Sequence, residues 1–367
     1  MARSHGGDGL TTPSELKNVV EKLAAEHGFA RVGICDATPT AYREEVVQWI
    51  AKGAHGTMSY LESRLDERVD PSVYVEGALS IICVADRYSD GKRDRVWHGE
   101  GPRGRIARYA RGRDYHKVMK KRLLKIAKHL GDIEPAATFR VAVDTAPLLE
   151  REHAARAGLG LVGKNTLLIE PGIGSWMLLG AIVTTAKIQP TTSSFLRSDP
   201  CGSCTRCIDA CPTQAIEPFQ VDATRCIAYT SIEHRGVIDE TMARATGDWI
   251  FGCDICQEVC PHSARPKRGE GPPVHEAYDS DRGDIDLLEI LGWDEEARMK
   301  ALLGTAAKRA SLAMWKRNAI ICAANIIRDE PKNPAAVELQ RRLEELATDS
   351  SEEEIVRLQA AQSLNAE

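Results

Sequence analysis

The sequence contains no long apolar run. Its 367 residues include no stretch of 18 or more consecutive apolar residues, whereas a helix needs about 20 to cross the hydrocarbon core of a bilayer. Residues 1–15 also lack the apolar segment of a secretion signal. We therefore expect a soluble, cytoplasmic protein with no membrane contact.

Aromatic residues are scarce, at 5%, and the net charge of −5 shows that the chain is not a polycation overall. Positive charge nevertheless gathers in residues 92–128, where fourteen Lys and Arg stand against three acidic residues. The fourteen are Lys92, Arg93, Arg95, Arg103, Arg105, Arg108, Arg111, Arg113, Lys117, Lys120, Lys121, Arg122, Lys125 and Lys128. This excess indicates either a polyanionic partner or a solvated basic helix face, and both stay open at this point.

The ten histidines form no pair at metal-ligand spacing, so the cysteines are the candidate ligands. Eight of the eleven cysteines lie in residues 201–260, and the first four follow C-x2-C-x2-C-x3-C-P. This is the run of two-cluster ferredoxins, in which the fourth cysteine ligates the other cluster. Crossed ligation predicts one [4Fe-4S] set of Cys201, Cys204, Cys207 and Cys260. The other set is Cys211, Cys226, Cys253 and Cys256.

Other uses of these cysteines fit the spacing less well. Structural zinc also uses C-x2-C pairs, but zinc ribbons rarely place four cysteines within eleven residues before a proline. Disulfides agree poorly with an odd total and no secretion segment. The three remaining cysteines lie in apolar runs and are expected to be buried free thiols: Cys35, Cys83 and Cys322.

The second cysteine set is interrupted. Residues 227–252 separate Cys226 from Cys253, whereas a plain two-cluster ferredoxin has a compact second run. Inserted residues beside a cluster can contact the molecule that the cluster reduces, and we predict this role from the spacing.

Capping signals and periodicity predict helices and strands in alternation from residue 14 to residue 187. Thr12-Pro13-Ser14-Glu15 is a capping box that opens a helix ending near Glu26. Further helices are predicted over 41–52, 114–130 and 148–156. Strands are predicted over 30–35, 78–85, 139–143, 167–169 and 176–184.

This alternation favours an α/β domain over residues 12–190, after a disordered tail of residues 1–11. A Pro/Ser/Thr-rich segment, 188–200, leads into a ferredoxin-type domain over 191–265. Residues 266–367 are predicted to be helical, with an amphipathic helix over 314–327. Paired helices here are similar to one or two HEAT repeats, and their apolar face needs the preceding domain to cover it.

Residues 158–163 spell G-x-G-x-x-G, the fingerprint of a dinucleotide loop. A helical stretch precedes the motif and no helix follows it, so the context is wrong for a nicotinamide cofactor. A tight backbone that admits a large planar ligand is the better interpretation.

Asp144 follows an apolar strand, and the carboxyl ends of strands in α/β sheets are where ligands collect. A partly buried carboxyl at this position can have a raised pKa and act as a general acid. The alternative, an N-cap for the helix near Leu148, is equally consistent with the residues alone.

Seven collinear motifs over residues 14–330 resemble those of the epoxyqueuosine reductase family. They are Asp66-Glu-Arg68-Val-Asp-Pro71, Gly112-Arg-Asp-Tyr-His116, Val143-Asp144-Thr145, the stretch from Glu152 to Asn165, CGSCTRCIDACPT, the stretch from Cys226 to Gly236, and the stretch from Gly252 to Pro261. The family is similar to reductive dehalogenases, which also pair cobalamin with two [4Fe-4S] clusters. The resemblance implies an enzyme that reduces the epoxide of epoxyqueuosine in the tRNA anticodon loop to queuosine, the last step of queuosine synthesis.

The resemblance also assigns site residues. Asp144 falls on the family's proton donor. Cobalamin contacts are implied at Arg68, Ala107, Tyr109, Asp144, Lys164, Asn165, Leu168, Pro171, Ser175, Ala228, Cys253 and Asp254. Contacts to tRNA are expected at Arg108, Arg111, Arg113, Tyr229, His234 and Arg235, and the short C-terminal helical region leaves its share of tRNA binding open.

The implied chemistry uses Co(I) cobalamin, fed by the two clusters from a flavodoxin- or ferredoxin-type donor. The sequence has no Asp-x-His-x-x-Gly motif, so cobalamin is expected base-off, without a protein histidine ligand. We expect a monomer that acts on a tRNA with a modified wobble base. The alternatives are a reductive dehalogenase-like enzyme for small molecules, a ferredoxin-type carrier and a non-catalytic zinc- and RNA-binding module.

Overall fold

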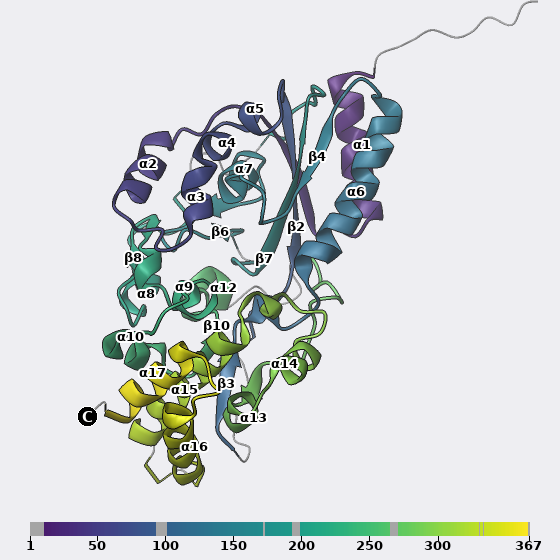
Figure 1. The fold of residues 1–367 in the computed structure, drawn as a ribbon. Helices are drawn as coiled ribbons and strands as arrows, with labels where there is room; N and C mark the ends of the chain where they lie inside the picture. The colour runs from purple at the N-terminus through teal and green to yellow at the C-terminus, as the bar shows by residue number, and fades with distance from the viewer. Residues whose placement is uncertain are drawn as a thin grey trace, which may run out of the picture.

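The structure, a computed structural model, describes residues 11–92, 101–171, 173–192, 199–264, 271–329, 331–332 and 334–365. Its upper part in Figure 1 is a four-stranded sheet between two layers of helices. The strand order is β1 (Arg31–Asp36), β2 (Ser80–Arg87), β7 (Met177–Thr184) and β4 (Phe139–Ala142). Each predicted strand matches an observed one to within a few residues.

All three pairings in this sheet are antiparallel, which corrects the α/β assignment. A parallel sheet would need each helix to return the chain to the same edge. Here the chain alternates helices and strands yet reverses direction at every pairing. The argument that placed Asp144 at the carboxyl edge of a parallel sheet therefore does not hold.

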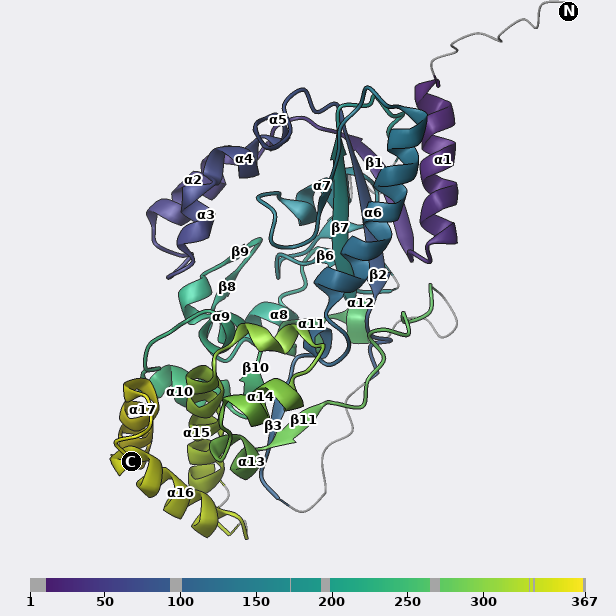
Figure 2. The same ribbon diagram turned by 45° about the vertical axis from the view of Figure 1, so that its right-hand side comes forward.

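Helices cover both faces of the sheet (Figures 1 and 2). On one face lie α1 (Pro13–Glu26) and α6 (Tyr115–Ile133), which pack on Ile34, Ile82 and Ile182. The other face carries α7 (Glu150–Arg156), and Cys35 and Cys83 lie buried there as predicted. The short helices beyond it are α2 (Arg43–Ala51), α3 (Ser59–Ser63), α4 (Leu65–Val69) and α5 (Pro71–Tyr74).

The predicted capping box at the start of α1 is confirmed. Thr12 Oγ1 accepts the Glu15 N–H at 3.2 Å, and the Thr12 N–H donates to Glu15 Oε2 at 2.8 Å. These reciprocal bonds satisfy two of the amides that a helix N-terminus leaves without partners.

The cysteine-rich segment below the sheet contains short elements. They are α8 (Arg206–Asp209), β8 (Ile216–Glu217), β9 (Gln220–Val221), η2 (Ala223–Arg225), α11 (Ile255–Glu258) and α12 (Pro261–Ala264). The insertion forms α9 (Ile227–Ile232), α10 (Glu240–Thr246) and β10 (Trp249–Phe251).

A second sheet joins all three predicted segments. Its central strand, β3 (Arg103–Ile106), pairs in parallel with β10 and antiparallel with β11 (Asp284–Asp286). Each strand comes from a different predicted domain. The predicted domain boundaries at residues 190 and 265 remain a prediction. The three predicted domains share this sheet.

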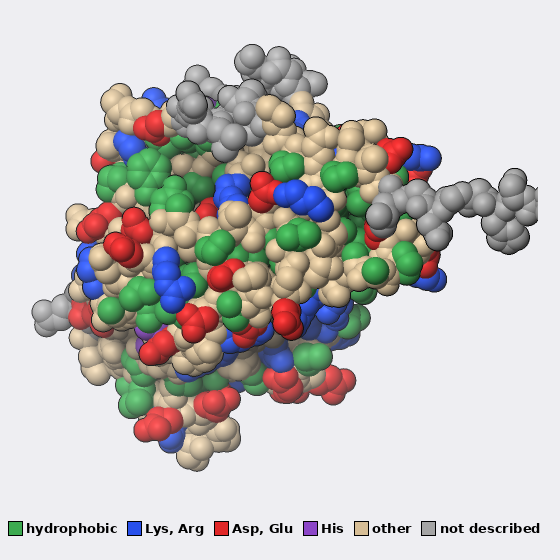
Figure 3. All heavy atoms as spheres, turned by 90° about the horizontal axis from the view of Figure 1, so that it is seen from above, with side chains coloured by type: hydrophobic (Ala, Val, Ile, Leu, Met, Phe, Trp, Pro, Cys, Tyr) green, Lys and Arg blue, Asp and Glu red, His purple; other side chains and the backbone are tan. Residues whose placement is uncertain are grey.

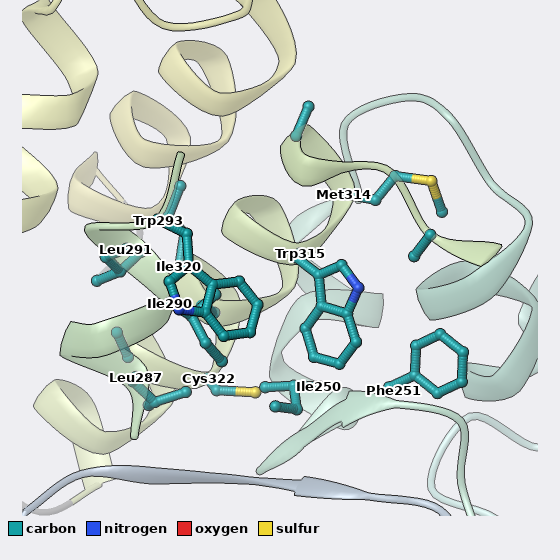
Figure 4. Packing of buried hydrophobic residues seen from close by; sticks show 14 of the residues in the cluster. Ile250, Phe251, Leu287, Ile290, Leu291, Trp293, Met314, Trp315, Ile320 and Cys322 are labelled. Carbon is teal, nitrogen blue, oxygen red and sulfur yellow. The ribbon is translucent and has the colours of Figure 1, made fainter. Parts of the chain in front are cut away.

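The C-terminal helices pack around one central helix, α15 (Leu312–Asp329). Around it lie α13 (Leu287–Leu291), α14 (Glu295–Ala301), η3 (Ala306–Arg309), α16 (Ala336–Thr348) and α17 (Glu354–Asn365). Most of α15 is buried, Cys322 included, and even Lys316, Arg317 and Asn318 on the polar side of the predicted amphipathic helix are buried. In Figure 4 Trp315 faces Phe251 of the insertion, with ring centroids 5.4 Å apart. The preceding segments thus cover the apolar face of the C-terminal helices.

The glycine-rich segment 158–163 forms no dinucleotide loop. It follows α7 and leads into β5 (Leu161–Val162), which pairs with β6 (Leu168–Ile169). A Cβ on Gly160 would lie 2.6 Å from the Ile169 carbonyl oxygen, and one on Gly163 would lie 2.4 Å from Ile169 Cδ1. The close approach is to the chain's own strand, and a planar ligand beside this segment stays a prediction.

Across the described ranges, no helix combines the length and apolarity needed to span a bilayer.

Candidate active site and cluster-binding region

The four cysteines of the first predicted set line one cavity. Its volume is about 130 Å³, and its lining includes Cys201, Cys204, Cys207 and Cys260. The backbone N–H of Lys164 donates to Cys201 Sγ at 3.3 Å. Amides directed at sulfur are among the groups that tune iron–sulfur clusters. The space and the four sulfur donors fit a [4Fe-4S] cluster.

The second predicted set is also brought together. Burial raises the pKa of the Cys253 and Cys256 thiols, and the neighbouring Cys226 thiol raises both further. Cys211 acts in the same way on Cys226, and its Sγ accepts the Ala215 N–H at 3.3 Å. These four thiols are therefore close neighbours.

The two sets adjoin each other, and an exposed loop carries the first. The Cys207 thiol of the first set contributes to the raised pKa of Cys256 in the second. Gly202, Ser203 and Thr205, in the loop that carries the first set, are exposed.

Asp144 lies two residues after β4 in a strained conformation. Its φ is +55°, a left-handed value that few residues other than glycine adopt. The Thr145 N–H donates to the Val143 carbonyl at 2.6 Å and closes a three-residue turn around Asp144. The Asp144 N–H donates to Glu150 Oε1 at 2.8 Å, so a helix that follows holds the strained turn. Strain held in this way is typical of functional positions.

The carboxylate of Asp144, with 55% of its side chain exposed, is 3.0 Å from His116 Nε2. The other ring nitrogen of His116, Nδ1, is 2.8 Å from Asp114 Oδ1. Asp114 is also the N-cap of α6 and accepts the His116 N–H at 3.1 Å. One imidazole at the start of α6 thus bridges two carboxylates.

These contacts set the charges of the pair. Burial acts to lower the pKa of His116, but the hydrogen bonds and charges of Asp144 and Asp114 outweigh it and raise that pKa. Burial acts to raise the pKa of Asp144, but the bond to His116 and its charge lower it overall. The expectation of a raised pKa at Asp144 is therefore wrong. The proton that the two groups share is therefore favoured on His116 over Asp144.

Glu150 is the carboxyl with the raised pKa. Burial, together with the charge of Asp144, raises the pKa of Glu150 to about 8. It is therefore mostly protonated at pH 7. Sequence reasoning missed both Glu150 and His116, although the Gly112–His116 motif pointed to the second.

Tyr109, Tyr115 and Arg68 surround Asp144. Burial and the charge of Asp144 raise the pKa of both tyrosines, which keeps their hydroxyls protonated. Burial lowers the pKa of Arg68, whose guanidinium responds to the charges of Asp144 and Glu150. Within the described part of the chain, Arg68 Nε has no hydrogen-bond partner although it is buried. A polar donor left free beside Asp144 fits a bound ligand.

Arg309 reaches the same site from the C-terminal helices. Its Nη2 donates to Glu233 Oε2 at 2.9 Å, and its Nε bonds to the other carboxylate oxygen. The guanidinium carbon is 6.0 Å from the ring of Tyr60, which is 44% exposed. The charge of Arg309 also contributes to the lowered pKa of Asp144. No sequence signal linked Arg309 to the site, because it follows Asp144 by more than one hundred residues.

The residues implied for cobalamin fall into two groups. Near Asp144 and the second cysteine set lie Arg68, Ala107, Tyr109, Ala228, Cys253 and Asp254. Asp254 is buried, accepts the Arg108 N–H at 2.8 Å, and has a pKa raised by burial to about 6.

The other implied contacts are used inside the protein. Lys164 Nζ donates to the Gly202 carbonyl at 2.6 Å, and Asn165 Nδ2 donates to the Cys256 carbonyl at 3.5 Å. The side chain of Leu168 is buried in the core, and the Ser175 hydroxyl bonds to Gln257 and Ser263. Pro171 is exposed. Direct side-chain contact with a cofactor is therefore wrong for Leu168 and Ser175.

Two of the six residues expected to contact tRNA are buried. Arg108 lies over Trp176, 4.5 Å from the ring centroid, and donates to Glu258. The Tyr229 hydroxyl accepts the Thr57 N–H at 2.7 Å. Burial in these contacts contradicts a tRNA-facing role for both side chains. The other four remain at least partly exposed: Arg111, Arg113, His234 and Arg235.

The basic segment becomes the outer face of α6. Its exposed cations are Lys117, Lys120, Lys121, Lys125 and Lys128. Arg93 and Arg95 lie outside the described residues. Figure 3, a view from above, shows acidic and basic side chains interspersed over that face of the molecule. The α6 face begins beside His116, so it leads away from Asp144.

Comparison with known proteins assigns a class to this arrangement. The family model for a 4Fe-4S double cluster binding domain matches residues 200–263. This places the chain among proteins with a two-cluster domain. A second model, described as epoxyqueuosine reductase QueG, DUF1730, matches residues 68–145.

Whole-chain relatives identify the family. The epoxyqueuosine reductase of Xanthomonas campestris pv. campestris is 39% identical over 310 residues, 83% of this chain and 86% of that protein. The enzyme of the same name from Aliivibrio fischeri is 35% identical over 313 residues, 85% of this chain and 83% of that one. The chain belongs to the epoxyqueuosine reductase family.

Solved structures agree with this assignment. A crystal structure of epoxyqueuosine reductase with a tRNA-Tyr epoxyqueuosine-modified tRNA stem loop matches with a TM-score of 0.84 and 26% identity, covering 96% of this chain and 90% of that one. The epoxyqueuosine reductase from Streptococcus thermophilus matches with a TM-score of 0.78 and 27% identity, covering 95% and 98%.

The cysteine sets lead to a prediction about iron content. Protein reconstituted anaerobically should bind about eight iron atoms, four per cluster. Cys260→Ser should lower the iron content toward half, because Cys260 lines the first cavity with three other cysteines. Cys322→Ser, at a buried cysteine in the C-terminal core, is the matched control and should keep all the iron. Iron and zinc analysis checks this, and zinc without iron would contradict both sets.

Proposed function

We propose that the protein is an epoxyqueuosine reductase that acts on tRNA. The observation that carries the proposal is its membership of that family over more than four fifths of the chain. The site supports it, since a strained carboxylate bonded to an imidazole lies near Tyr109, which packs with Cys253 of the second cysteine set. The reaction converts the epoxide on the cyclopentane ring of the modified base to an alkene.

The balance of this reaction defines what the site must supply. Both C–O bonds of the epoxide break, a C=C bond forms, and the oxygen leaves as water. Two electrons and two protons are consumed. The electrons would enter at the first cysteine set and pass to the second. Cys253 of the second set packs with Tyr109, which is a neighbour of Asp144.

Cobalamin would be held between the sheet and the second cysteine set. The residues that fit are Arg68, whose Nε is free to donate, and the apolar group that contains Ala107, Tyr109 and Cys253. When bound in reduced form, cobalamin supplies a strongly nucleophilic metal centre. A base-off state without a protein histidine ligand is part of the proposal.

Asp144 and His116 would transfer a proton to the epoxide oxygen. The raised pKa of His116 favours the proton on its imidazole, and Asp144 Oδ2 would accept the hydrogen bond from Nε2 at 3.0 Å. Asp144 is the more exposed of the two, so it would pass the His116 proton to the epoxide oxygen as that oxygen develops negative charge. Asp114 fixes the imidazole through Nδ1 and favours its protonated form.

A tRNA anticodon loop is the proposed partner. Modified bases in loops are unstacked and can enter a pocket. The α6 lysines and Arg113 would contact phosphates, and the partly exposed Arg235 and His234 would lie near the loop. We further propose HEAT-like packing of the C-terminal helices, a monomeric enzyme in the cytoplasm, and an electron donor of the flavodoxin or ferredoxin type.

Replacing the proposed proton carrier tests the function. Asp144→Asn should lower turnover of epoxyqueuosine-containing tRNA by about 10²- to 10⁴-fold, because an amide cannot relay the proton. Iron content should be unchanged. Nucleosides from digested tRNA, separated and weighed by mass spectrometry, report the loss of one oxygen atom. Asp132→Asn, at an exposed position near the end of α6, is the matched control. Near-normal turnover by the Asp144 variant would exclude the role, and no turnover by the wild-type holoenzyme would exclude the function.

The pH profile tests the assignment of the proton to His116. Its pKa is raised in the folded protein, so the protonated form persists below the ordinary value of about 6.5 and is lost as pH rises through the raised value. Turnover should therefore fall on the alkaline side. His116→Asn should lose this dependence, whereas Glu150→Gln should retain it. An unchanged profile in His116→Asn would contradict the assignment.

Salt dependence tests the α6 face. The logarithm of stem-loop affinity should fall linearly with the logarithm of salt concentration. The double variant Lys117→Gln/Lys120→Gln should reduce that slope by about 1 to 2. Lys187→Gln is the control, because Lys187 lies outside α6, after the end of β7, and pairs with Asp36. Fluorescence anisotropy provides the affinities, and equal slopes in both variants would argue against phosphate contacts on α6.

A further inference from the structure

Arg317 of α15 is completely buried, and all five of its N–H groups are bonded. Its Nη1 donates to the carbonyls of His234 at 2.6 Å and Gly236 at 2.9 Å. Its Nη2 donates to the Thr230 carbonyl at 2.6 Å. The remaining N–H groups, on Nη2 and Nε, donate to Asn318 Oδ1 at 2.8 and 3.1 Å.

Asn318 extends the same contact. Its Nδ2 donates to the Ser231 carbonyl at 2.9 Å and the Ile250 carbonyl at 2.8 Å. We call Arg317 and Asn318 together the carbonyl clamp. Its five backbone acceptors all belong to the insertion between Cys226 and Cys253.

The clamp buries a charged side chain, and removing that charge from water opposes folding. No carboxylate in the described part of the chain bonds to Arg317, and burial, with repulsion from Arg235, lowers the pKa of Arg317 to about 10. Buried charges are often replaced by apolar residues without loss of stability. Bonds that use every donor of a rigid fork instead fix the positions of their acceptors.

The clamp holds a segment with a functional residue at each end. Helix α9 starts directly after Cys226, its N-cap, and its last turn supplies the Thr230 and Ser231 carbonyls. The next residue, Glu233, bonds to Arg309 at the Asp144 site. A shift of α9 would therefore move a cluster ligand and the site together.

We propose that Arg317 and Asn318 are positioning residues that hold residues 226–236 in register with the substrate and the second cluster. The proposal rests on the proposed function for the identity of the substrate, a base in an RNA loop. It assigns to the C-terminal helices a role in shaping the site from behind, separate from any contact that they make with RNA.

The same helix provides a matched control. Asn325, two turns after Asn318, donates in the same manner to the Ala243 and Gly247 carbonyls of the insertion, at 3.0 and 2.9 Å. These acceptors lie on and after α10, away from Cys226 and Glu233. Asn318→Ala and Asn325→Ala therefore each remove two donated bonds from two parts of one insertion, and Asn318→Ala also removes the acceptor of two Arg317 N–H groups.

Hydrogen–deuterium exchange of the cluster-loaded holoenzyme tests the clamp without substrate. Asn318→Ala should speed exchange in residues 227–237 and spare residues 240–247, and Asn325→Ala should do the reverse. Equal effects of both variants on both segments would overturn the clamp, whatever the enzyme's substrate. Arg317→Lys keeps the charge but not the forked set of donors, and it should resemble Asn318→Ala. If Asn318→Ala does not fold, Arg317→Lys provides the test.

Steady-state kinetics test the positioning. With tRNA bearing epoxyqueuosine, Asn318→Ala and Arg317→Lys should raise KM about tenfold, the effect of roughly one lost hydrogen bond to a charged group. Asn325→Ala should leave KM unchanged at a similar loss of thermal stability. Parallel changes of KM and stability in all three variants would reduce the clamp to a purely structural role. Failure of the wild-type enzyme to turn over, with the exchange pattern intact, would count against the proposed function alone.

Discussion

The separation of Cys226 from Cys253 is the constraint on which the rest of the structure depends. A cluster needs these two cysteines within one set, yet residues 227–252 lie between them. The chain closes this gap by folding the insertion into α9, α10 and β10 and pairing β10 with β3. Side chains of α15 then bind the insertion from behind. The C-terminal helices thus hold the segment that joins two cysteines of the second predicted set.

The electrostatics of the site follow from where this assembly meets the four-stranded sheet. Asp144 is close to His116, Glu150 and, through the C-terminal helices, Arg309. Two cations offset one exposed carboxylate and lower its pKa, while the buried carboxyl behind it is protonated. Neighbouring groups whose pKa values are shifted in opposite directions can take separate roles as proton donor and proton acceptor. One of the two protons that the proposed reaction consumes would come from His116 and pass through Asp144.

The sequence predicted the local elements well and their arrangement poorly. The capping box at Thr12, the strands and the cysteine spacing are short-range signals, and each depends on residues that are close in the chain. The antiparallel order of the sheet and the pairing of β3 with β10 and β11 depend on long-range contacts that no periodicity encodes. The same limit applies to the site. Asp144 could be selected through the Val143-Asp144-Thr145 motif of the family resemblance, but Glu150 and Arg309 became visible only once the chain was folded. Arg108 and Tyr229 were assigned to RNA from their residue type, and burial against Trp176 and Thr57 shows why type alone was misleading.

A single-turnover experiment tests the central claim most directly, namely that the cysteine-bound clusters deliver electrons for epoxide reduction on tRNA. Holoenzyme is reduced, freed of excess reductant, and mixed anaerobically with a stem loop that contains epoxyqueuosine. Visible absorbance follows cluster oxidation while mass spectrometry counts the product. The account predicts one queuosine formed for every two electrons lost from the protein. Cluster oxidation without product, or product without cluster oxidation, would contradict it.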